Sequence, residues 1–159
     1  MVDTDLACTP WKANFRVEFR INASSPQDIG SLFKASGTEF INGIAINQNF
    51  ADYVDKVFVR SQRYELWSDG DLIGLLAFYR NDAAKEIYVT SISISEKHQG
   101  MGYGKYLLER LLADNCQGHI NSVRLEVSID NQKAINLYNS LNFEIRSKHN
   151  QSYMMERLL

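Results

Sequence analysis

The stretch best suited to chemistry is a glycine-rich turn, Gln99 to Gly104, between a strand-like apolar pattern and a helix-like one. Its glycines stand at positions 100, 102 and 104. Glycine permits a tight turn and lets the backbone approach a ligand without a Cβ in the way. The first amides of the following helix then point outward, and such a helix start binds anions, most often phosphate. The sequence therefore predicts an anion site at this turn.

The spacing of the glycines distinguishes between kinds of phosphate loop. A P-loop requires Gly, four residues, then Gly-Lys and a hydroxyl residue, but Gln99 stands at the first position and Tyr106 at the last. The dinucleotide fingerprint Gly-x-Gly-x-x-Gly, begun at Gly100 or at Gly102, does not end on glycine. The pattern that remains is Gln-x-x-Gly-x-Gly between a strand and a helix.

Length and composition predict one domain spanning residues 1–159, with residues 1–13 as a loose lead-in. The net charge of −2 and the absence of a basic cluster argue against a nucleic-acid partner. No apolar run is long enough for a signal peptide or a membrane span, so we expect no membrane partner and a cytoplasmic location. Cys8 and Cys116 lack metal-ligand spacing and are expected to be free thiols, with no metal site. The oligomeric state stays open, a homodimer included.

The elements that must position the turn follow from hydrophobic periodicity. The predicted order is β-α-α-β-β-β-α-β-α-β-β, a mixed α/β fold whose mostly antiparallel sheet has six to seven strands and about four flanking helices. Strands are expected at 14–22, 64–68, 72–81, 86–95, 123–127, 143–149 and 153–159, and helices at 26–36, 50–61, 105–115 and 131–141. The predicted inward stripes are Ile29, Leu32 and Phe33; Phe50, Tyr53, Val54, Val57 and Phe58; Leu107, Leu108, Leu111 and Leu112; and Ala134, Leu137, Tyr138 and Leu141.

In this setting, Gln99 to Gly104 resembles the signature [Arg/Gln]-x-x-Gly-x-[Gly/Ala] of the GCN5-related N-acetyltransferase (GNAT) superfamily. Asn131 to Phe143 resembles a second family segment, Asn-x-x-Ala-x-x-Leu-Tyr-x-x-x-Gly-Phe, with Asn142 in place of the glycine. Asn tolerates a positive φ, so that turn is expected to survive. With the element order, the resemblance covers nearly the whole chain. It implies transfer of an acetyl group from acetyl-coenzyme A (acetyl-CoA) to an amine, without a covalent acyl-enzyme.

The resemblance also implies which residues hold the cofactor. The turn and helix start would bind the pyrophosphate mainly through backbone amides, and the backbone of the preceding strand would pair with the pantetheine arm. Asn131 would touch that arm, with helix capping as its alternative role. The residues concerned are Ile92, Ile94, Gln99, Gly100, Met101, Gly102, Tyr103, Gly104, Lys105 and Asn131.

Two further residues are expected to be catalytic. Tyr138 resembles the family tyrosine that protonates the departing thiolate, since a phenol and a thiol differ by about 1.5 pKa units; packing on an apolar stripe is its alternative role. Glu126 resembles the general base of the ribosomal-protein N-terminal acetyltransferases, and its alternative is a surface glutamate beside Arg124. Other candidates for deprotonating the amine are a water relay and the side chains Glu39, Asp52, Glu86 and Thr90.

The acceptor is the least defined part of the prediction. We expect a primary amine of a small molecule. The alternatives are a protein N-terminus or lysine, and a module that binds acetyl-CoA without turnover. Residues 37–49, expected to line the acceptor cleft as a loop or distorted helix, match no pattern that identifies a substrate.

Overall fold

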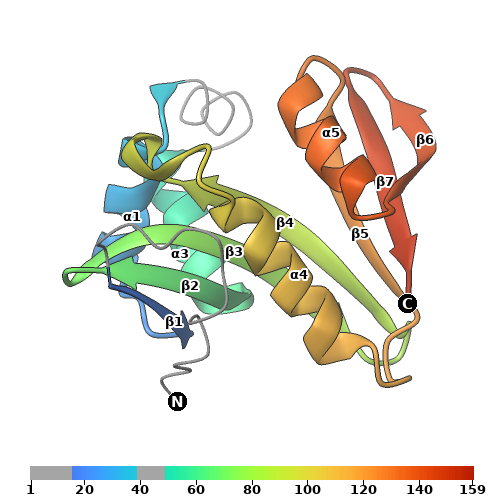
Figure 1. Cartoon of the computed structure of the whole chain (residues 1–159), viewed down its shortest axis with the longest axis horizontal. Helices are drawn as coiled ribbons and strands as arrows, with labels where there is room; N and C mark the ends of the chain where they lie inside the picture. Colours follow the sequence, from blue (N-terminus) through green and yellow to red (C-terminus); the bar gives the residue numbers. More distant parts are fainter. Residues whose placement is uncertain (1–15, 39–48) are drawn as a thin grey trace. The chain divides into compact units, whose positions relative to one another are not determined.

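The computed structural model describes residues 16–38 and 49–159. Seven strands hydrogen-bond in one sheet in the order β1-β2-β3-β4-β5-β7-β6, shown with the helices of the described residues in Figure 1. The elements are β1 (Val17–Ile21), α1 (Pro26–Ala35), α3 (Phe50–Arg60), β2 (Gln62–Ser68), β3 (Asp71–Asn81), β4 (Glu86–Ile94), the 3₁₀ turn η2 (Glu96–His98), α4 (Tyr103–Asn115), β5 (Ser122–Ser128), α5 (Gln132–Ser140), β6 (Glu144–His149) and β7 (Ser152–Leu158). The predicted fold class and element order are confirmed.

The chain forms two compact units. Unit 1 consists of the described residues up to Ala77 together with Ser91–Leu107, and unit 2 consists of Phe78–Thr90 together with Leu108–Leu159. Strands β3 and β4 each begin in one unit and end in the other, as does helix α4. The expected lead-in at residues 1–13 and most of the segment 37–49 lie outside the described residues, and the assignment of the whole chain to one domain stays a prediction.

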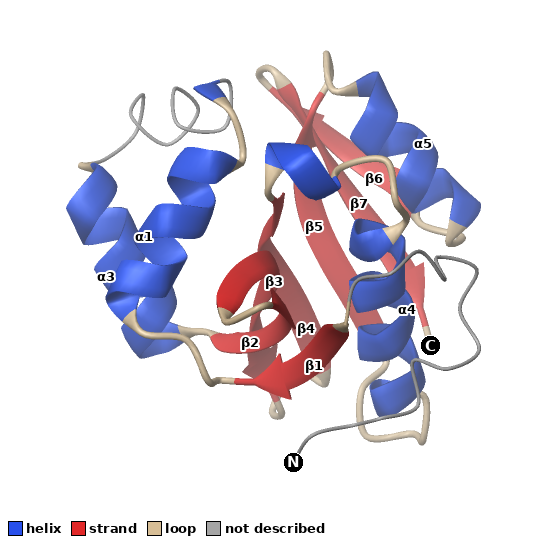
Figure 2. Ribbon diagram, turned by 60° about the vertical axis from the view of Figure 1, so that its left-hand side comes forward, coloured by secondary structure: helices blue, strands red, loops and turns tan. Residues whose placement is uncertain are grey.

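Helix α1 of unit 1 begins as its sequence predicts. Ser25 is the N-cap, Pro26 is the first helical residue, and a capping box joins Ser25 to Asp28. Helices α1 and α3 lie side by side (Figure 2), and their apolar stripes share one core with β2 and β3. Buried members of that core are Ile29, Leu32, Phe33, Val54, Val57, Trp67, Leu72, Leu75 and Ala77.

A buried ion pair ties the corner between β1 and α1 to strand β2. The Glu65 carboxylate, fully buried, accepts from Arg63 Nε at 3.3 Å and from Trp67 Nε1 at 3.0 Å. The backbone amides of Ala23 and Ser24 each donate to it at 3.1 Å. Arg63 also donates to the carbonyl of Phe58, near the end of α3. Removal of either partner would therefore leave a buried charge uncompensated.

Helix α5, the segment that follows it, and strands β5 and β7 contribute buried side chains to unit 2. Strands β5 and β7 pair antiparallel over their whole length, from Ser122↔Leu158 to Ser128↔Ser152. The first stretch of β4 pairs parallel with β5, from Glu86↔Ser122 to Val89↔Leu125. Strand β6 pairs with β7 and carries a register shift between Ile145 and Ser147. Buried side chains in this unit include Val123, Leu125, Val127, Ile135, Tyr138, Leu141, Phe143 and Met155.

Two details of the predicted helix faces are wrong. Phe58, expected to face inward from α3, is 37% exposed, and the Arg63 guanidinium lies over its ring at 5.2 Å. In α5, Tyr138 and Leu141 are buried as predicted, but Ala134 and Leu137 are only half-buried, and Ile135, which was not predicted, is buried instead. The four leucines of α4 are buried as predicted. No helix within residues 16–38 and 49–159 is long and apolar enough to cross a membrane.

Candidate active site

The glycine-rich turn lies in unit 1, between the 3₁₀ turn η2 and the start of α4. Gly100 and Gly102 both have left-handed backbones, with φ of +78° and +84°. The Gly102 carbonyl accepts from Tyr106 N at 3.0 Å, so the first helical hydrogen bond of α4 starts at this glycine. A Cβ built on Gly100 or Gly102 meets no atom of the described residues within 4 Å. The glycines are therefore needed for the backbone conformation, and they leave open space beside the helix start.

The Gln99 side chain hydrogen-bonds the turn to two neighbouring segments of the protein. Its side-chain amide donates to the carbonyl of Ile94 at 2.9 Å and to the carbonyl of Ser36 at 3.3 Å. The turn is thereby tied to the end of β4 and to the end of α1. Next to it, Ser95 Oγ lies 2.6 Å from Nδ1 of His98. Both bonds of the Gln99 side chain go to backbone groups of the protein, and its contribution to an anion site is to fix where the glycines lie.

The first turn of α4 supplies the groups that an anion would meet. The leading amides of a helix have no acceptor within that helix, and the helix dipole adds partial positive charge there. The Tyr103 side chain is buried, which raises its pKa, whereas Lys105 and Met101 lie at the surface. The residues from Gln99 to Lys105 therefore form one continuous surface segment with a buried anchor at Tyr103.

Ile92 and Ile94 lie on β4 beyond its paired register with β5, which ends at Val89↔Leu125. Their side chains are half-buried and alternate with the buried residues Ser91 and Ser93. The Ile94 carbonyl already accepts the bond from Gln99. The strand end and the glycine turn are thus joined directly within unit 1.

Tyr138 lies in unit 2 at the end of α5, where a Schellman motif closes the helix. The Phe143 amide donates to the Tyr138 carbonyl and the Asn142 amide to the Asn139 carbonyl, both at 3.0 Å, with Asn142 at φ +61°. The expectation that Asn142 preserves this turn is confirmed. The Tyr138 ring packs on Phe143 with 5.9 Å between ring centroids. Burial raises the pKa of Tyr138 to about 12, so its hydroxyl keeps its proton at neutral pH.

Asn131 caps the start of the same helix. Its side-chain oxygen accepts from the amide of Ala134 at 3.1 Å. The capping role that the sequence allows is therefore present. The side-chain nitrogen, which is a donor, is not used by this cap.

Glu126 lies on β5 with its side chain exposed. Its carboxylate accepts a hydrogen bond from the Ser152 hydroxyl, at the start of β7. Arg124, on the same face, instead pairs with Glu86 at 3.2 Å. The sequence identified Glu126 but not Ser152, because the contact depends on the register between β5 and β7. Of the other candidate bases, Glu86 is thus ion-paired, Asp52 is exposed on α3, Thr90 is half-buried, and Glu39 lies outside the described residues.

Unit 1 contains a cavity of about 490 Å³ between α1, the start of β3 and the segment Ser95 to His98. Its charged lining residues are Asp28, Asp71, Glu96 and Lys97, with His98 beside them. Asp28 is already held by the capping box of α1. Apolar lining comes from Leu32, Ala35, Leu72 and Ile73. The cavity is therefore partly apolar and carries more carboxylates than cations.

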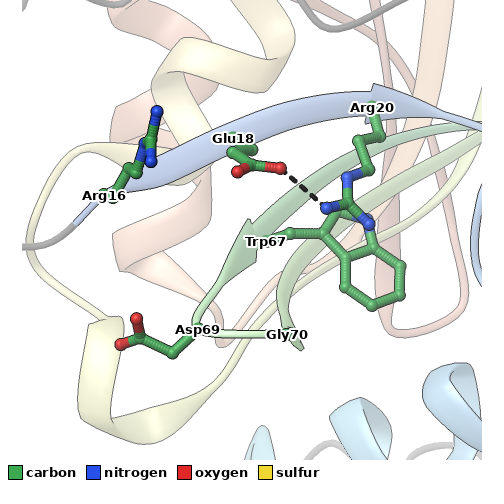
Figure 3. Close-up of a pocket in the computed structure, with 6 residues that line it drawn as sticks. All are labelled: Arg16, Glu18, Arg20, Trp67, Asp69 and Gly70. Atoms are coloured by element: carbon green, nitrogen blue, oxygen red, sulfur yellow. Dashed lines mark hydrogen bonds and ion pairs between the residues drawn. The ribbon is translucent and has the colours of Figure 1, made fainter.

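A second, smaller hollow of about 110 Å³ lies over β1 and the hairpin that joins β2 to β3 (Figure 3). Within it, Arg20 donates to Glu18 at 2.7 Å and its guanidinium lies 5.0 Å from the centre of the Trp67 ring. Arg20 is thus satisfied by groups of unit 1 itself. We assign this hollow no part in the site.

The predicted site residues fall into two groups. Ile92, Ile94 and the residues from Gln99 to Lys105 belong to unit 1, where the structure brings them together on one strand end and one turn. Glu126, Asn131 and Tyr138 belong to unit 2, on β5 and at the two ends of α5. No group of three or more His, Cys, Asp or Glu side chains placed to hold a metal ion occurs in the described part of the chain.

Comparison with known proteins places this arrangement in context. Residues 33–143 match the acetyltransferase (GNAT) family. The GNAT domain of PAT from S. lividans is similar in structure, with a TM-score of 0.75 and 20% identity, covering 90% of each chain. The ribosomal-protein-S18-alanine N-acetyltransferase of Escherichia coli has a TM-score of 0.71 at 17% identity, covering 88% of this chain and 93% of its own.

A third similar structure is the PaiA N-acetyltransferase of Thermoplasma acidophilum in complex with coenzyme A. It has a TM-score of 0.70 at 15% identity and covers 89% of this chain and 99% of its own. At these identities the likeness concerns the fold. No curated protein sequence matches the chain significantly.

Proposed function

The chain belongs to the acetyltransferase (GNAT) family, and we propose that it transfers the acetyl group of acetyl-coenzyme A to the primary amine of a small molecule. The resemblance drawn from the two sequence motifs is thereby confirmed at the level of the family. The family implies acetyl-coenzyme A as the acetyl donor. The transfer itself is a direct attack of the amine on the thioester while both substrates are bound.

The observation that carries this proposal is the geometry of the glycine turn. Two left-handed glycines, Gly100 and Gly102, place the start of α4 beside open space, where a Cβ would meet no described atom. A pyrophosphate suits such a place, because it is anionic and accepts hydrogen bonds from backbone amides. Gln99 keeps the turn in place through its bonds to Ile94 and Ser36. The residues present therefore fit the phosphate end of coenzyme A.

The pantetheine arm needs donors and acceptors along its length, since it contains two amide groups. Backbone groups near Ile92 and Ile94 would supply them in the manner of an added strand. Asn131 would contribute its side-chain nitrogen, which the helix cap leaves available as a donor. Met101, Tyr103, Gly104 and Lys105 complete the cofactor set that we propose.

A protonated amine loses two protons in this reaction, one before it attacks the thioester and one from the nitrogen after the N–C bond has formed, while the leaving sulfur gains one proton. The amine must lose its proton to have a lone pair for attack, and we assign this proton to the Glu126 carboxylate, directly or through a water. As the new N–C bond forms, the C–S bond breaks and its electrons stay on sulfur. Tyr138 then hydrogen-bonds to this thiolate and supplies its proton. The second nitrogen proton passes to the Tyr138 phenolate, directly or through water, and the protonated Glu126 releases its proton to solvent, so that both side chains return to their starting states.

The cavity of unit 1 supports a small cationic acceptor. Asp28, Asp71 and Glu96 outnumber Lys97 around it, so the local field favours a protonated amine. Its apolar lining residues suit the hydrocarbon part of a small amine. One wall, Ser95 to His98, is also the segment that leads from β4 into the glycine turn. Cavity and cofactor turn thus share one piece of backbone.

A protein N-terminus or lysine is the second candidate acceptor. The feature that favours it is the sequence spacing of Glu126 on β5 and Tyr138 on α5, which resembles that of the ribosomal-protein N-terminal acetyltransferases. A module that binds acetyl-coenzyme A without turnover is the third candidate, and a retained Tyr138 speaks against it.

The proposal is tested by incubating the protein with acetyl-coenzyme A and acceptors while free thiol is measured. The panel contains putrescine, phenethylamine and an alanine-initiated hexapeptide. We expect thiol release with one of the two small amines at a higher kcat/KM than with the peptide. A preference for the peptide would favour the second candidate. Binding of acetyl-coenzyme A without thiol release on any acceptor would contradict the enzyme assignment.

A further inference from the structure

The face of the sheet that carries Glu126 is defined by the strand register of unit 2. Side chains alternate along a strand, so Arg124, Glu126 and Ser128 share one face of β5. Ser128 pairs with Ser152 of β7, and Ser152 pairs with His149 of β6. Ser152 and His149 therefore lie on the Glu126 face, one row away from the carboxylate. Of these two side chains, Ser152 belongs to the strand next to β5, and it is the one that reaches the carboxylate that we assign as the base.

The Ser152 hydroxyl is the group that the structure joins to Glu126. Its Oγ donates to Oε1 of the carboxylate and also lies 3.2 Å from the backbone carbonyl of His149. A hydroxyl carries one proton, and a bond to a charged acceptor is the stronger of the two. The proton is therefore directed at Glu126. The His149 carbonyl therefore does not share this proton, and Ser152 lies at the start of β7, next to the turn that follows β6.

The neighbouring charge does not compete for this carboxylate. Arg124 shares the strand face but pairs with Glu86, with 3.2 Å between its Nη1 and the carboxylate oxygen. The second oxygen of Glu126, Oε2, makes no hydrogen bond within the described part of the chain. One oxygen of the carboxylate is thus anchored, and the other is available to take a proton.

We propose that Ser152 is a positioning residue for Glu126 in the acetyl transfer. An exposed glutamate has several rotatable bonds, and a proton transfer requires its oxygen within hydrogen-bond reach of the amine. The hydroxyl holds Oε1, which restricts the side chain and presents Oε2 to the acceptor. Such restriction raises the fraction of complexes with reactive geometry. The inference rests on the proposed function and adds a residue to it.

The effect should appear in turnover and not in cofactor binding. Ser152→Ala removes the hydroxyl and leaves the carboxylate in place, so we expect kcat to fall about tenfold, which equals about 1.4 kcal/mol in the activation free energy. The KM for acetyl-coenzyme A should stay unchanged. Ser152→Thr keeps a hydroxyl at the same strand position and should restore most of the turnover.

Ser147→Ala is the matched control. Ser147 also carries a hydroxyl on this face of the sheet, but it lies 3.1 Å from Nε2 of the His149 ring and not at Glu126. Its removal should leave kcat within twofold of the wild type. The double variant Glu126→Gln plus Ser152→Ala should be no slower than Glu126→Gln alone. Once the Glu126 carboxylate has been replaced, the Ser152 hydroxyl has no base to position, so its loss should cost nothing more.

The experiment measures thiol release from acetyl-coenzyme A with putrescine, phenethylamine and the alanine-initiated hexapeptide for these five proteins and the wild type. Wild-type kcat in Ser152→Ala, together with a slow Glu126→Gln, would overturn the positioning role while the proposed function stands. Additive losses in the double variant, or no recovery in Ser152→Thr, would also overturn it. Wild-type kcat in Glu126→Gln would remove Glu126 from the mechanism, and the role of Ser152 with it. No thiol release by the wild type on any acceptor would overturn the proposed function itself.

Discussion

Replacement of Tyr138 by phenylalanine tests how the leaving thiolate is stabilised. A thiol has a pKa of about 8.5, and burial raises the pKa of Tyr138 to about 12. The gap is therefore roughly 3.5 units instead of the roughly 1.5 expected from unperturbed values, and complete proton transfer costs about 4.8 kcal/mol. Tyr138 should thus act first as a hydrogen-bond donor to the thiolate, with the proton following as the acetyl group leaves.

The size of the effect follows from that role. A hydrogen bond to a charged group contributes about 1.5–3 kcal/mol, so Tyr138→Phe should lower kcat about ten- to 150-fold. The phenyl ring keeps its packing on Phe143, so the KM for acetyl-coenzyme A should change little. The assay is steady-state thiol release with the best amine of the panel. Tyr79→Phe, which removes a half-buried phenol from β3, is the control and should match the wild type. An unchanged kcat in Tyr138→Phe would refute the assignment.

Three further predictions concern stability and the cofactor turn. The folded-state pKa of Tyr138, about 12, exceeds its ordinary value of 10.0, so the folded state binds more protons than the unfolded state between pH 10 and 12. Up to about 2.7 kcal/mol of unfolding free energy is therefore lost as the pH rises through that window. Denaturant titrations should show a smaller loss in Tyr138→Phe. Gly102→Val should remove most of the coenzyme A binding measured by calorimetry. Gly118→Val is the control, because Gly118 has the same left-handed backbone and equally open surroundings in the described residues; this variant should bind normally despite a similar backbone strain of about 1–2 kcal/mol. Equal binding by both variants would mean that the turn does not hold the cofactor. Glu65→Gln should cost about 3–5 kcal/mol of unfolding free energy because Arg63 stays buried without its counter-charge. Glu18→Gln, in a pair whose side chains are about one third exposed, should cost less than about 1 kcal/mol. Similar losses in the two variants would contradict the importance of burial.

Local signals predicted the helix starts and turns well. Ser25 and Pro26 marked the beginning of α1, and the structure shows the expected cap at that position. Asp69-Gly70 marked the hairpin between β2 and β3, where both residues have a positive φ. These features depend on a few adjacent residues, so the sequence contains all the information that they need.

Features that depend on distant residues could not be predicted in the same way. The sequence of β2 does not show that Arg63 and Glu65 are buried, because their partners are Ser24, Trp67 and the end of α3. Phe58 has the spacing of a core residue, but the core over α3 is already filled by Val54 and Val57. The spacing of apolar residues in a helix therefore does not show which of them lie beyond the edge of the core.

In the candidate site too, features set by neighbouring residues could be predicted from the sequence, and contacts between distant residues could not. The spacing of the glycines predicted an anion site at the turn from Gln99 to Gly104, and the role proposed for Tyr138 comes from the resemblance of the segment around it to the family pattern. The contact between Ser152 and Glu126 was not found, because it requires the register of β5 against β7. Nor does the sequence reveal that Gln99 bonds to Ile94 and Ser36, the second of which is 63 positions away.

The central claim is that this protein moves an acetyl group from acetyl-coenzyme A to an amine nitrogen. The most direct measurement follows acetyl-coenzyme A labelled with isotope in its acetyl group, incubated with the wild-type protein and putrescine, phenethylamine or the alanine-initiated hexapeptide. We predict that the label appears in an amide of the acceptor, in equal molar amount to the thiol released. Label found only in free acetate, or retained in bound acetyl-coenzyme A without thiol release, would contradict the claim.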